Sequence, residues 1–212
     1  MSGKVLTMAQ QKGGAGKTTL VAQLAVALAA RGMTVGLLDI DPQGSLTQWF
    51  RIREAAGATE RMTLTAVTGW RAQATVDKLK ASSDLVLVDS APHAEIEAKI
   101  AVRVADLILV PVQPSPLDVW ATEPTLALAR SEKRKVLIVI NRTQTRVKLA
   151  EALYARIAEL GADVADSTIG NRISFAASMM EGRGVVETAP KSKAALEMLS
   201  LADEITKRLP PG

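Results

Sequence analysis

Short apolar runs recur along the chain, and each one is followed by a polar or glycine-rich segment and then by a stretch with helical spacing. The runs cover residues 4–9, 35–39, 85–88, 107–112 and 136–140. Uninterrupted apolar runs of this length are typical of central strands in a parallel sheet, because such strands are buried on both faces. Five strand–helix alternations predict an α/β fold, a doubly wound and mostly parallel sheet flanked by helices.

The remaining segments fit this alternation, although residues 45–80 are less informative than the rest. Ser45 is a suitable cap for a helix that contains Trp49 and Phe50. The other expected elements are a short strand over 62–67, a helix over 70–79, a helix over 147–160, a short strand near 163–169 and a last helix over 192–208. One side of the last helix should pack against the core, through Leu196, Leu199, Ala202, Ile205 and Leu209.

A glycine-rich loop joins the first apolar run to the first helical stretch. Its glycines lack a Cβ, so the backbone can turn its N–H groups toward a polyphosphate. The helix that begins at Lys17 adds the positive end of its dipole. Lys17 can then reach the β- and γ-phosphates, while the Thr18 hydroxyl can ligate Mg²⁺. The predicted nucleotide-binding residues of this loop are Gly13, Gly14, Ala15, Gly16, Lys17, Thr18 and Thr19.

Acidic residues follow two other apolar runs. Asp39 and Asp41 stand at the end of the run over 35–39, and Asp89 ends the run over 85–88. Ligands of open α/β sheets bind outside the carboxyl ends of the strands, so these acids and the glycine loop should meet in one site. Asp89 fits the role of an acid that holds Mg²⁺ through water.

Composition excludes several classes of protein. The chain has 212 residues, 48% of them hydrophobic, which is enough for a single domain spanning 1–212 with a large core. Cysteine is absent, which excludes disulfides and cysteine-ligated metal clusters. No apolar run approaches the roughly 20 residues that span a bilayer, and the first strand begins too near Met1 for a signal peptide. We therefore expect a cytoplasmic protein.

Charge is distributed unevenly along the chain. Residues 1–132 contain 13 basic and 13 acidic residues, whereas residues 133–212 contain 13 basic and 9 acidic residues. The whole net charge of +4 therefore lies in the C-terminal part. A basic part of this size is a modest indication of a polyanionic partner.

The glycine loop departs from the common G-x-x-x-x-G-K-[ST] pattern at its start. Gln11 stands at the position of the first glycine, and Lys12 follows it. The sequence from Lys12 to Thr19 resembles the deviant Walker A box of the ParA/MinD family of dimeric ATPases. Residues 39–43, Asp-Ile-Asp-Pro-Gln, are similar to that family's Asp-x-Asp-Pro-Gln box. The resemblance covers nearly the whole chain and implies a P-loop NTPase fold with ATP and Mg²⁺ as cofactors.

The resemblance also implies roles for individual residues. Lys12 would cross the dimer interface to the partner's nucleotide, although a solvated loop lysine is the plain alternative. Asp41 would position the attacking water, and Asp39 would support Mg²⁺ and the surrounding loops. The predicted catalytic residues are thus Lys12, Lys17 and Asp41, and the predicted metal-binding residues are Thr18, Asp39 and Asp89. After the run over 136–140, Asn141 would recognise adenine, with Arg142 beside it.

Residues 113–118 are expected to form a stiff, proline-rich loop after the run over 107–112. A similar Pro-Ser-Pro-Leu-Asp segment occurs in small plasmid-partition ATPases, where it borders the nucleotide and the dimer interface. The alternative is that these prolines only end the strand.

Several branches of the family match poorly. Nitrogenase-iron-protein-like members need cysteines, and the bacterial tyrosine kinases carry a tyrosine cluster, whereas Tyr154 is the single tyrosine here. MinD-like membrane cycling uses a C-terminal amphipathic basic helix, whereas residues 210–212 read Pro-Pro-Gly. Large plasmid ParA proteins have an N-terminal helix-turn-helix domain, whereas the first strand is expected from residue 4. The chain is therefore similar to a small, ParF-like ParA ATPase.

Such ATPases, by resemblance, form homodimers on ATP and bind DNA nonspecifically, which would make this chain nucleoid-associated. They position or segregate a cargo, such as a plasmid, a chromosome region or a large protein cluster, and a ParB-like or cargo adaptor protein stimulates hydrolysis. No membrane partner is expected. Two alternatives remain: an ATP-dependent metabolic enzyme, such as a small ligase or kinase on the same scaffold, and a MinD-like membrane-cycling ATPase.

The candidate DNA contacts are basic residues of the C-terminal part. Arg172 and Lys193 match positions where relatives place DNA-contacting residues. The complete candidate set is Arg172, Lys191, Lys193, Arg183 and Arg146. Each of them could instead be a solvated surface charge.

Overall fold

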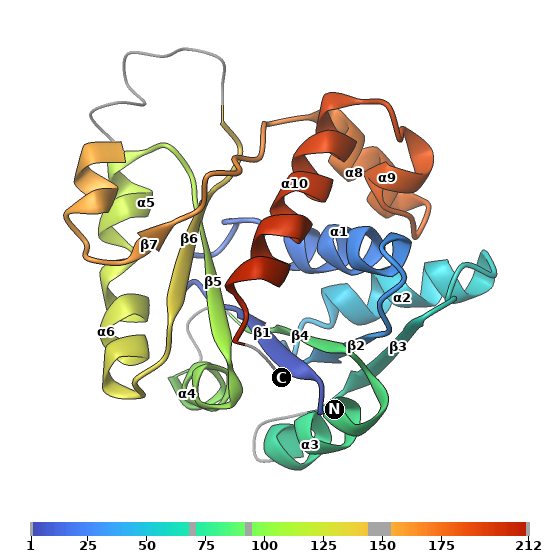
Figure 1. Cartoon of the computed structure of the whole chain (residues 1–212), viewed down its shortest axis with the longest axis horizontal. Helices are drawn as coiled ribbons and strands as arrows, with labels where there is room; N and C mark the ends of the chain where they lie inside the picture. Colours follow the sequence, from blue (N-terminus) through green and yellow to red (C-terminus); the bar gives the residue numbers. More distant parts are fainter. Residues whose placement is uncertain (1, 68–70, 92–94, 144–153, 211–212) are drawn as a thin grey trace.

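The computed structural model describes residues 2–67, 71–91, 95–143 and 154–210. A seven-stranded sheet lies between two sets of helices (Figure 1). The strand order is β3-β2-β4-β1-β5-β6-β7, and every pairing is parallel. This confirms the predicted fold class. The strands are β1 (Lys4–Met8), β2 (Val35–Asp39), β3 (Met62–Ala66), β4 (Leu85–Asp89), β5 (Leu107–Val112), β6 (Val136–Ile140) and β7 (Asp163–Val164).

The strand order changes direction at β1, which places the predicted site. β2, β3 and β4 lie on one side of β1, and β5, β6 and β7 lie on the other. The register pairs Met8 with Asp89, and Asp89 in turn with Asp39. The ends of three neighbouring strands therefore carry the glycine loop and two of the predicted acids, at the crevice where open α/β sheets bind ligands.

Helices cover both faces of the sheet (Figure 1). On one face, α1 contacts β1, β2 and β4, while α2, α8, α9 and α10 surround α1. On the other face, α3 packs against the same strands, α4 packs against β1 and α3, and α6 packs against α4. The helices are α1 (Lys17–Ala30), α2 (Ser45–Ala55), α3 (Ala72–Ser82), α4 (Glu95–Val104), α5 (Pro116–Trp120), α6 (Glu123–Ser131), α8 (Ile173–Met180), α9 (Val185–Thr188) and α10 (Lys193–Arg208).

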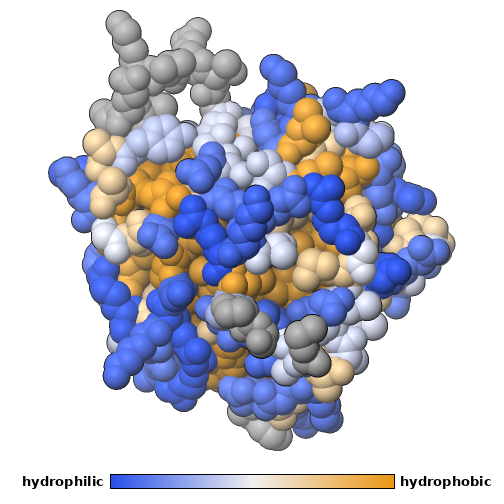
Figure 2. Space-filling model, in the orientation of Figure 1, coloured by the Kyte–Doolittle hydropathy of each residue, from blue (hydrophilic) through white to orange (hydrophobic). Residues whose placement is uncertain are grey.

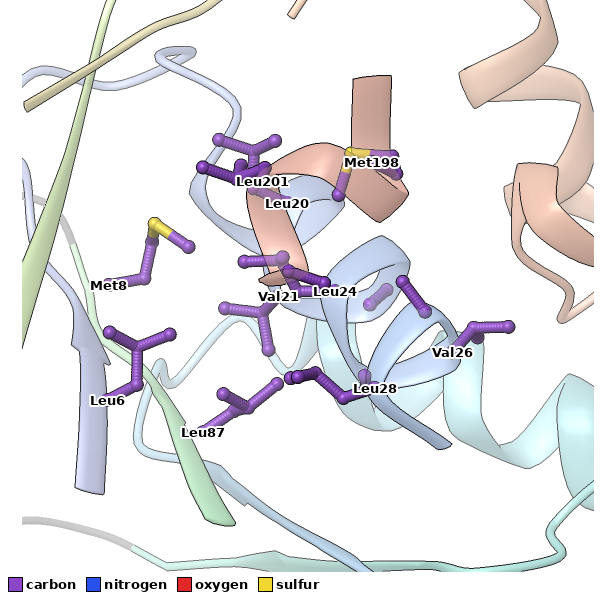
Figure 3. Close-up of a cluster of buried hydrophobic side chains, with 14 of the residues drawn as sticks. Leu6, Met8, Leu20, Val21, Leu24, Val26, Leu28, Leu87, Met198 and Leu201 are labelled. Carbon is purple, nitrogen blue, oxygen red and sulfur yellow. The ribbon is translucent and has the colours of Figure 1, made fainter. Parts of the chain in front are cut away.

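The central helix α1 is apolar around its whole circumference, as its position requires. Leu20, Leu24 and Leu28 are fully buried and occupy the centre of the largest core cluster (Figure 3). Met198 of α10 packs on the side of α1 away from the sheet, and Leu87 of β4 packs on the sheet side. Burying each such side chain stabilises the fold by about 1.5–3 kcal/mol. The glycine loop is therefore attached to a helix in which ten of fourteen residues are buried.

A buried ion pair joins α2 to α9. Arg53 donates to both oxygens of Glu187 and to the carbonyl of Gly182. The two backbones pass so close here that a Cβ on Gly182 would lie 2.4 Å from the backbone nitrogen of Arg53. Gly182 also has φ +64, so glycine is required at this position for both reasons.

Three sequence-based expectations need correction. Ser45 is the first residue of α2, and the cap position is Gly44 with φ 63, because the Asp39 carboxylate accepts the first-turn N–H instead. The segment expected to be loop becomes helical from Pro116, since proline favours the first helical position. Leu196 of α10 is exposed, and the buried side of that helix is formed by Ala194, Ala195, Met198, Leu201, Ala202 and Ile205.

Other expectations are limited by the described residues. The helix expected over 147–160 falls partly on residues 144–153, which lie outside them, and residues 154–158 are helical. The strand expected near 163–169 is short, because β7 contains two residues and pairing resumes only as an isolated bridge at Gly170. Among the tryptophans, Trp49 is in the core, Trp120 is exposed and Trp70 lies outside the described residues.

Candidate functional site

The glycine loop connects β1 to α1 and leaves its N–H groups available. Gly14 and Gly16 have φ values of 77 and 92, which explains the glycines at these positions. A Cβ on Gly13 or Gly14 would meet no atom within 4 Å, so the space beside the loop is open. No side chain caps α1 at Gly16. The first turn of α1 therefore presents its dipole and its free N–H groups to this open space.

Lys17 is buried beneath the loop. Its Nζ donates to the carbonyl of Gln10 at 3.0 Å. Burial lowers the pKa of Lys17, and the nearby Asp89 and Asp41 carboxylates oppose this change. The lysine thus lies at the phosphate loop, near one predicted metal-binding acid and one predicted catalytic acid.

Asp89 is fully buried at the end of β4, and neither of its carboxylate oxygens has a hydrogen bond of good geometry, although the Thr18 hydroxyl lies near them. Burial raises the pKa of Asp89 to about 7, with the Thr18 hydroxyl and Lys17 lowering it and Asp39 and Asp41 adding to the rise. A buried carboxylate without partners is costly unless a cation or donor joins it. Such a carboxylate beside the Thr18 hydroxyl fits an Mg²⁺ ion held at the phosphate loop.

Asp39 and Asp41 lie at the end of β2 but are engaged differently. Asp39 accepts from the Asp41 N–H at 3.1 Å, and its second oxygen accepts from the Thr47 N–H at 2.9 Å and hydroxyl at 2.6 Å. It therefore holds the start of α2 in place. The Asp41 side chain accepts only from the Gln43 N–H among the described residues. Within that part of the chain, no three acidic side chains converge as a ready metal cluster, so the role of Asp39 toward Mg²⁺ stays a prediction.

A cleft of about 810 Å³ opens beside Asp41. The end of β3 and the first turns of α2 form its walls, and Arg51 and Arg71 lie among its polar residues. Sequence reasoning passed over both arginines, because residues 45–80 carry no recognisable motif. The available signal for Arg51 was its spacing, because it lies four positions after Thr47 and therefore on the same side of the expected helix.

Lys12 forms an ion pair within its own chain. Its Nζ lies 2.6 Å from one oxygen of Asp118 on α5, which is 5% exposed, and the other Asp118 oxygen is buried without a partner. Two more contacts join this region to the loop, since Gln113 donates to the Gly14 carbonyl and Gln10 donates to the Thr122 hydroxyl. The proline-rich segment therefore borders the phosphate loop.

Asp118, Gln113 and Gln10 were not among the sequence-predicted site residues. Their partners lie about a hundred positions away in the chain, and no local pattern shows such contacts. The signal for Asp118 was its place after the carboxyl end of a parallel strand, where functional acids gather.

Asn141 is tied to the loop by its side chain. Its amide donates to the Ala15 carbonyl at 2.8 Å, and its oxygen accepts from the Arg142 N–H at 2.9 Å. A cavity of about 160 Å³ lies beside it, between Gly16 and Thr19 on one side and Arg172 on the other. This cavity adjoins the start of α1, and recognition of adenine by Asn141 stays a prediction.

The candidate DNA contacts do not form one cluster. Arg172 donates through Nε to Glu197 at 3.0 Å and through its terminal nitrogen to the other Glu197 oxygen, and this pairing raises the pKa of Arg172. Lys191 and Lys193 are exposed at the start of α10. Arg183 lies elsewhere, in a cavity of about 340 Å³ beside Glu187, and Arg146 is outside the described residues.

Comparison with known proteins agrees with this geometry. Residues 6–186 match the family model of the CobQ/CobB/MinD/ParA nucleotide-binding domain. Maintenance of carboxysome distribution protein A from Halothiobacillus neapolitanus is 32% identical over 213 aligned residues, which cover 96% of this chain and 94% of the relative. The chromosome-partitioning ATPase Soj from Thermus thermophilus is 27% identical, covering 96% of both chains.

A solved structure supports the fold. The septum site-determining protein MinD from Pyrococcus horikoshii, complexed with Mg-ADP, superimposes with a TM-score of 0.77 at 21% identity, covering 96% of both chains. In the described part of the present chain, no helix has the length and apolar character needed to cross a membrane.

Proposed function

The chain belongs to the CobQ/CobB/MinD/ParA nucleotide-binding family, and on this premise we propose that it is an Mg²⁺-dependent ATPase that dimerises on ATP and binds DNA nonspecifically in that state. In this role it positions or segregates an intracellular cargo on the nucleoid, and an adaptor protein stimulates hydrolysis. The relatives named for carboxysome distribution and chromosome partitioning support this class of function.

The observation that carries the ATPase activity is the buried, unpartnered carboxylate of Asp89 beside the phosphate loop. Bound Mg²⁺ would neutralise charge on the phosphates, with Thr18 and Asp89 as the residues that hold it. Lys17 and the loop N–H groups bind the phosphates in place. Of the two acids at the end of β2, Asp41 has only one side-chain hydrogen bond among the described residues, from the Gln43 N–H, which leaves its second oxygen available to orient a water molecule.

The Lys12–Asp118 pair supports a dimer-dependent cycle. In the single chain, Lys12 is held at 2.6 Å from Asp118 and so is turned toward its own α5. If Lys12 reaches the partner's nucleotide, this pair must first break. Dimerisation would therefore exchange an internal ion pair for contacts with the second nucleotide, which makes closure dependent on the phosphates.

A hydrolysis assay tests the proposal. We expect plasmid DNA together with the adaptor to raise the ATP turnover of the wild type. The Asp41→Ala variant should bind ATP but remain as a dimer on DNA, because the water is no longer oriented. Asp77→Ala, an exposed acid of α3, is the matched control and should behave as the wild type. An Asp41→Ala protein that stays monomeric with ATP would contradict the role of Asp41.

One observation favours a second candidate, an ATP-dependent metabolic enzyme. The 810 Å³ cleft beside Asp41 carries Arg51 and Arg71, which could bind an anionic small molecule near the phosphates. The same assay separates the two functions, because the turnover of a small-molecule enzyme would not respond to plasmid DNA.

A further inference from the structure

Helix α8 has an apolar side that faces away from the core. Its outward residues follow the spacing i, i+3, i+4 and i+7, which places Ile173, Ala176, Ala177 and Met180 in one stripe. Ile173 is 89% exposed and Met180 is 80% exposed, about 10 Å apart along the helix. The inner side of the same helix is buried through Phe175 and Ser178. The outward stripe is therefore additional to what folding requires.

Leu196 of α10 extends this stripe into a surface. It is 59% exposed and stands next to Glu197, which binds the Arg172 side chain at the start of α8. Figure 2 shows apolar atoms between hydrophilic ones at the end of the molecule where α8 and α10 lie. The α8 surface consists of five exposed residues: Ile173, Ala176, Ala177, Met180 and Leu196.

The charges around the α8 surface are unequal at its two ends. Lys193 lies on the same exposed strip of α10 as Leu196 and Glu197, with Lys191 two positions earlier. The nearby Arg172 and Glu197 neutralise each other. An exposed acid, Glu181, follows Met180 at the other end. The α8 surface is thus apolar along its length, basic at the Ile173 end and mildly acidic at the Met180 end.

We propose that the α8 surface docks a helical segment of a partner protein, apolar along one side and acidic at the end that lies against Lys191 and Lys193. Apolar side chains at helical spacing are the pattern with which one helix receives another. The acidic end is required by charge complementarity with the two lysines.

Three other occupants fit less well. A second copy docked by two-fold symmetry would either run parallel and bring the basic ends together, or run antiparallel and offer the two lysines a single acid, Glu181. DNA interfaces are strongly polar and leave such an apolar stripe without contacts. Each of the two lysines would contribute about 1 kcal/mol to binding an anionic lipid surface, whereas lipid-binding sites of this kind contain at least about four lysines or arginines.

The position of α8 gives this docking a consequence for the nucleotide cycle. Arg172, Phe175 and Ala176 line the cavity next to the phosphate loop, so one helix borders the nucleotide and also presents the α8 surface. Lys191 and Lys193 are at the same time candidate DNA contacts. This part of the inference rests on the proposed function: a docked acidic segment would compete with DNA phosphates for the two lysines and favour release.

The experiment uses a phage-displayed library of random peptides on the full chain. Peptides are selected on the wild type alone, and the double variant Ile173→Ser/Met180→Ser is kept for the binding measurement. Both substitutions are at exposed positions and should not disturb folding. Leu117→Ser, at an equally apolar and exposed position of α5, is the matched control. Synthetic copies of the selected peptides are then measured by fluorescence anisotropy with ADP present.

We expect the selected peptides to be amphipathic and acidic, and to bind the double variant at least about tenfold more weakly than the wild type or the Leu117→Ser control. Lys193→Glu should reverse the preference from acidic to basic peptides. Peptides that bind all variants equally, or that lack the acidic end, would overturn the proposal.

Two further outcomes would also overturn it. One is flotation with anionic phosphatidylglycerol vesicles that is lost in the double variant, which would assign the surface to lipid. The other is concentration-dependent self-association lost in the same variant, which would assign it to a second copy. Peptide binding is measured without DNA or hydrolysis, so it can be observed even if the protein is not a DNA-binding ATPase. Conversely, the protein can retain DNA with ATP even if no peptide binds the α8 surface.

Discussion

Buried charged groups lack partners at the carboxyl edge of the sheet, but they are paired on the helical side formed by α2, α8, α9 and α10. At the carboxyl edge, Asp89 has no partner for either oxygen, and Asp118 has none for one of its oxygens. On the helical side, Arg53 is also buried, but only its Nε lacks a partner, because its terminal nitrogens bond Glu187 and a carbonyl. Unpaired buried charge marks a site built for a ligand, whereas paired buried charge holds the fold together.

The largest effect is expected at Asp89. Asp89→Asn keeps the shape of the side chain and removes the negative charge that would hold Mg²⁺. ATP turnover should fall at least about a hundredfold, measured as phosphate release at saturating Mg-ATP. Asp106→Asn, an acid of the sheet's opposite edge that accepts from the Val5 N–H, serves as a control and should retain turnover. Turnover within a few-fold of the wild type in Asp89→Asn would remove Asp89 from the catalytic site.

The same variant has an opposite effect on stability, and this effect depends on pH. The folded pKa of Asp89 is about 7, and its unfolded value is 3.8. The folded state therefore binds a proton that the unfolded state loses, and the stability from this group, full below pH 3.8, is lost as the pH rises through about 7. Asparagine cannot ionise. Without nucleotide, the Tm of Asp89→Asn minus that of the wild type should grow over this interval and stay constant above it. A constant difference at all pH values would contradict the raised pKa.

On the helical side, removing one partner should damage the fold and spare the chemistry. Arg53→Ala leaves Glu187 partly buried without its cation, which should cost about 3 kcal/mol and lower the Tm by roughly 6–12 °C. ATP turnover per folded molecule should be unchanged. Arg31→Ala, which breaks the exposed pair with Asp203, is the matched control and should cost less than about 1 kcal/mol. Equal losses in the two variants would show that burial does not distinguish these pairs.

Local sequence patterns predicted the parts of the fold that depend on neighbouring residues. The apolar runs ending at Asp39 and Asp89 became adjacent parallel strands, because an uninterrupted run can be buried only at the centre of such a sheet. The cap of α2 was not predicted, since its acceptor is Asp39 from the preceding strand instead of Ser45. The exposure of Leu196 was missed for a related reason: helical spacing gives the stripes, but only packing decides which stripe is buried.

The candidate site was predicted to a similar extent. The phosphate loop and the strand-ending acids carry their chemistry in short motifs, so the sequence could indicate them. The partners of Lys12 and Arg172 come from distant segments, and no spacing rule connects Lys12 to Asp118 or Arg172 to Glu197. These two contacts change the functional reading most, because each engages a predicted functional cation within its own chain.

A moderate effect is expected when the acid opposite Lys12 is neutralised. In the proposed dimer, Lys12 leaves Asp118, and the buried carboxylate then loses its cation. Asp118→Asn removes that cost in both protomers, so the ATP-dependent dimer should form at about thirtyfold lower protein concentration, since each partly exposed pair is worth about 1 kcal/mol. Lys12→Ala should have the opposite effect. Light scattering with ATP measures both, and weaker dimerisation of Asp118→Asn would mean that Asp118 supports Lys12 in the dimer.

The smallest effects are expected among the candidate DNA contacts. Lys193 is exposed at the start of α10, so Lys193→Ala should reduce the slope of log affinity against log salt by about 2, one for each copy in the dimer. Arg172 is already neutralised by Glu197, so Arg172→Ala should change the slope less. Anisotropy of a labelled duplex at several salt concentrations, with ATP, compares them. An equal change in both variants would mean that the Arg172–Glu197 pair opens on DNA, so that a paired charge on the helical side also serves binding.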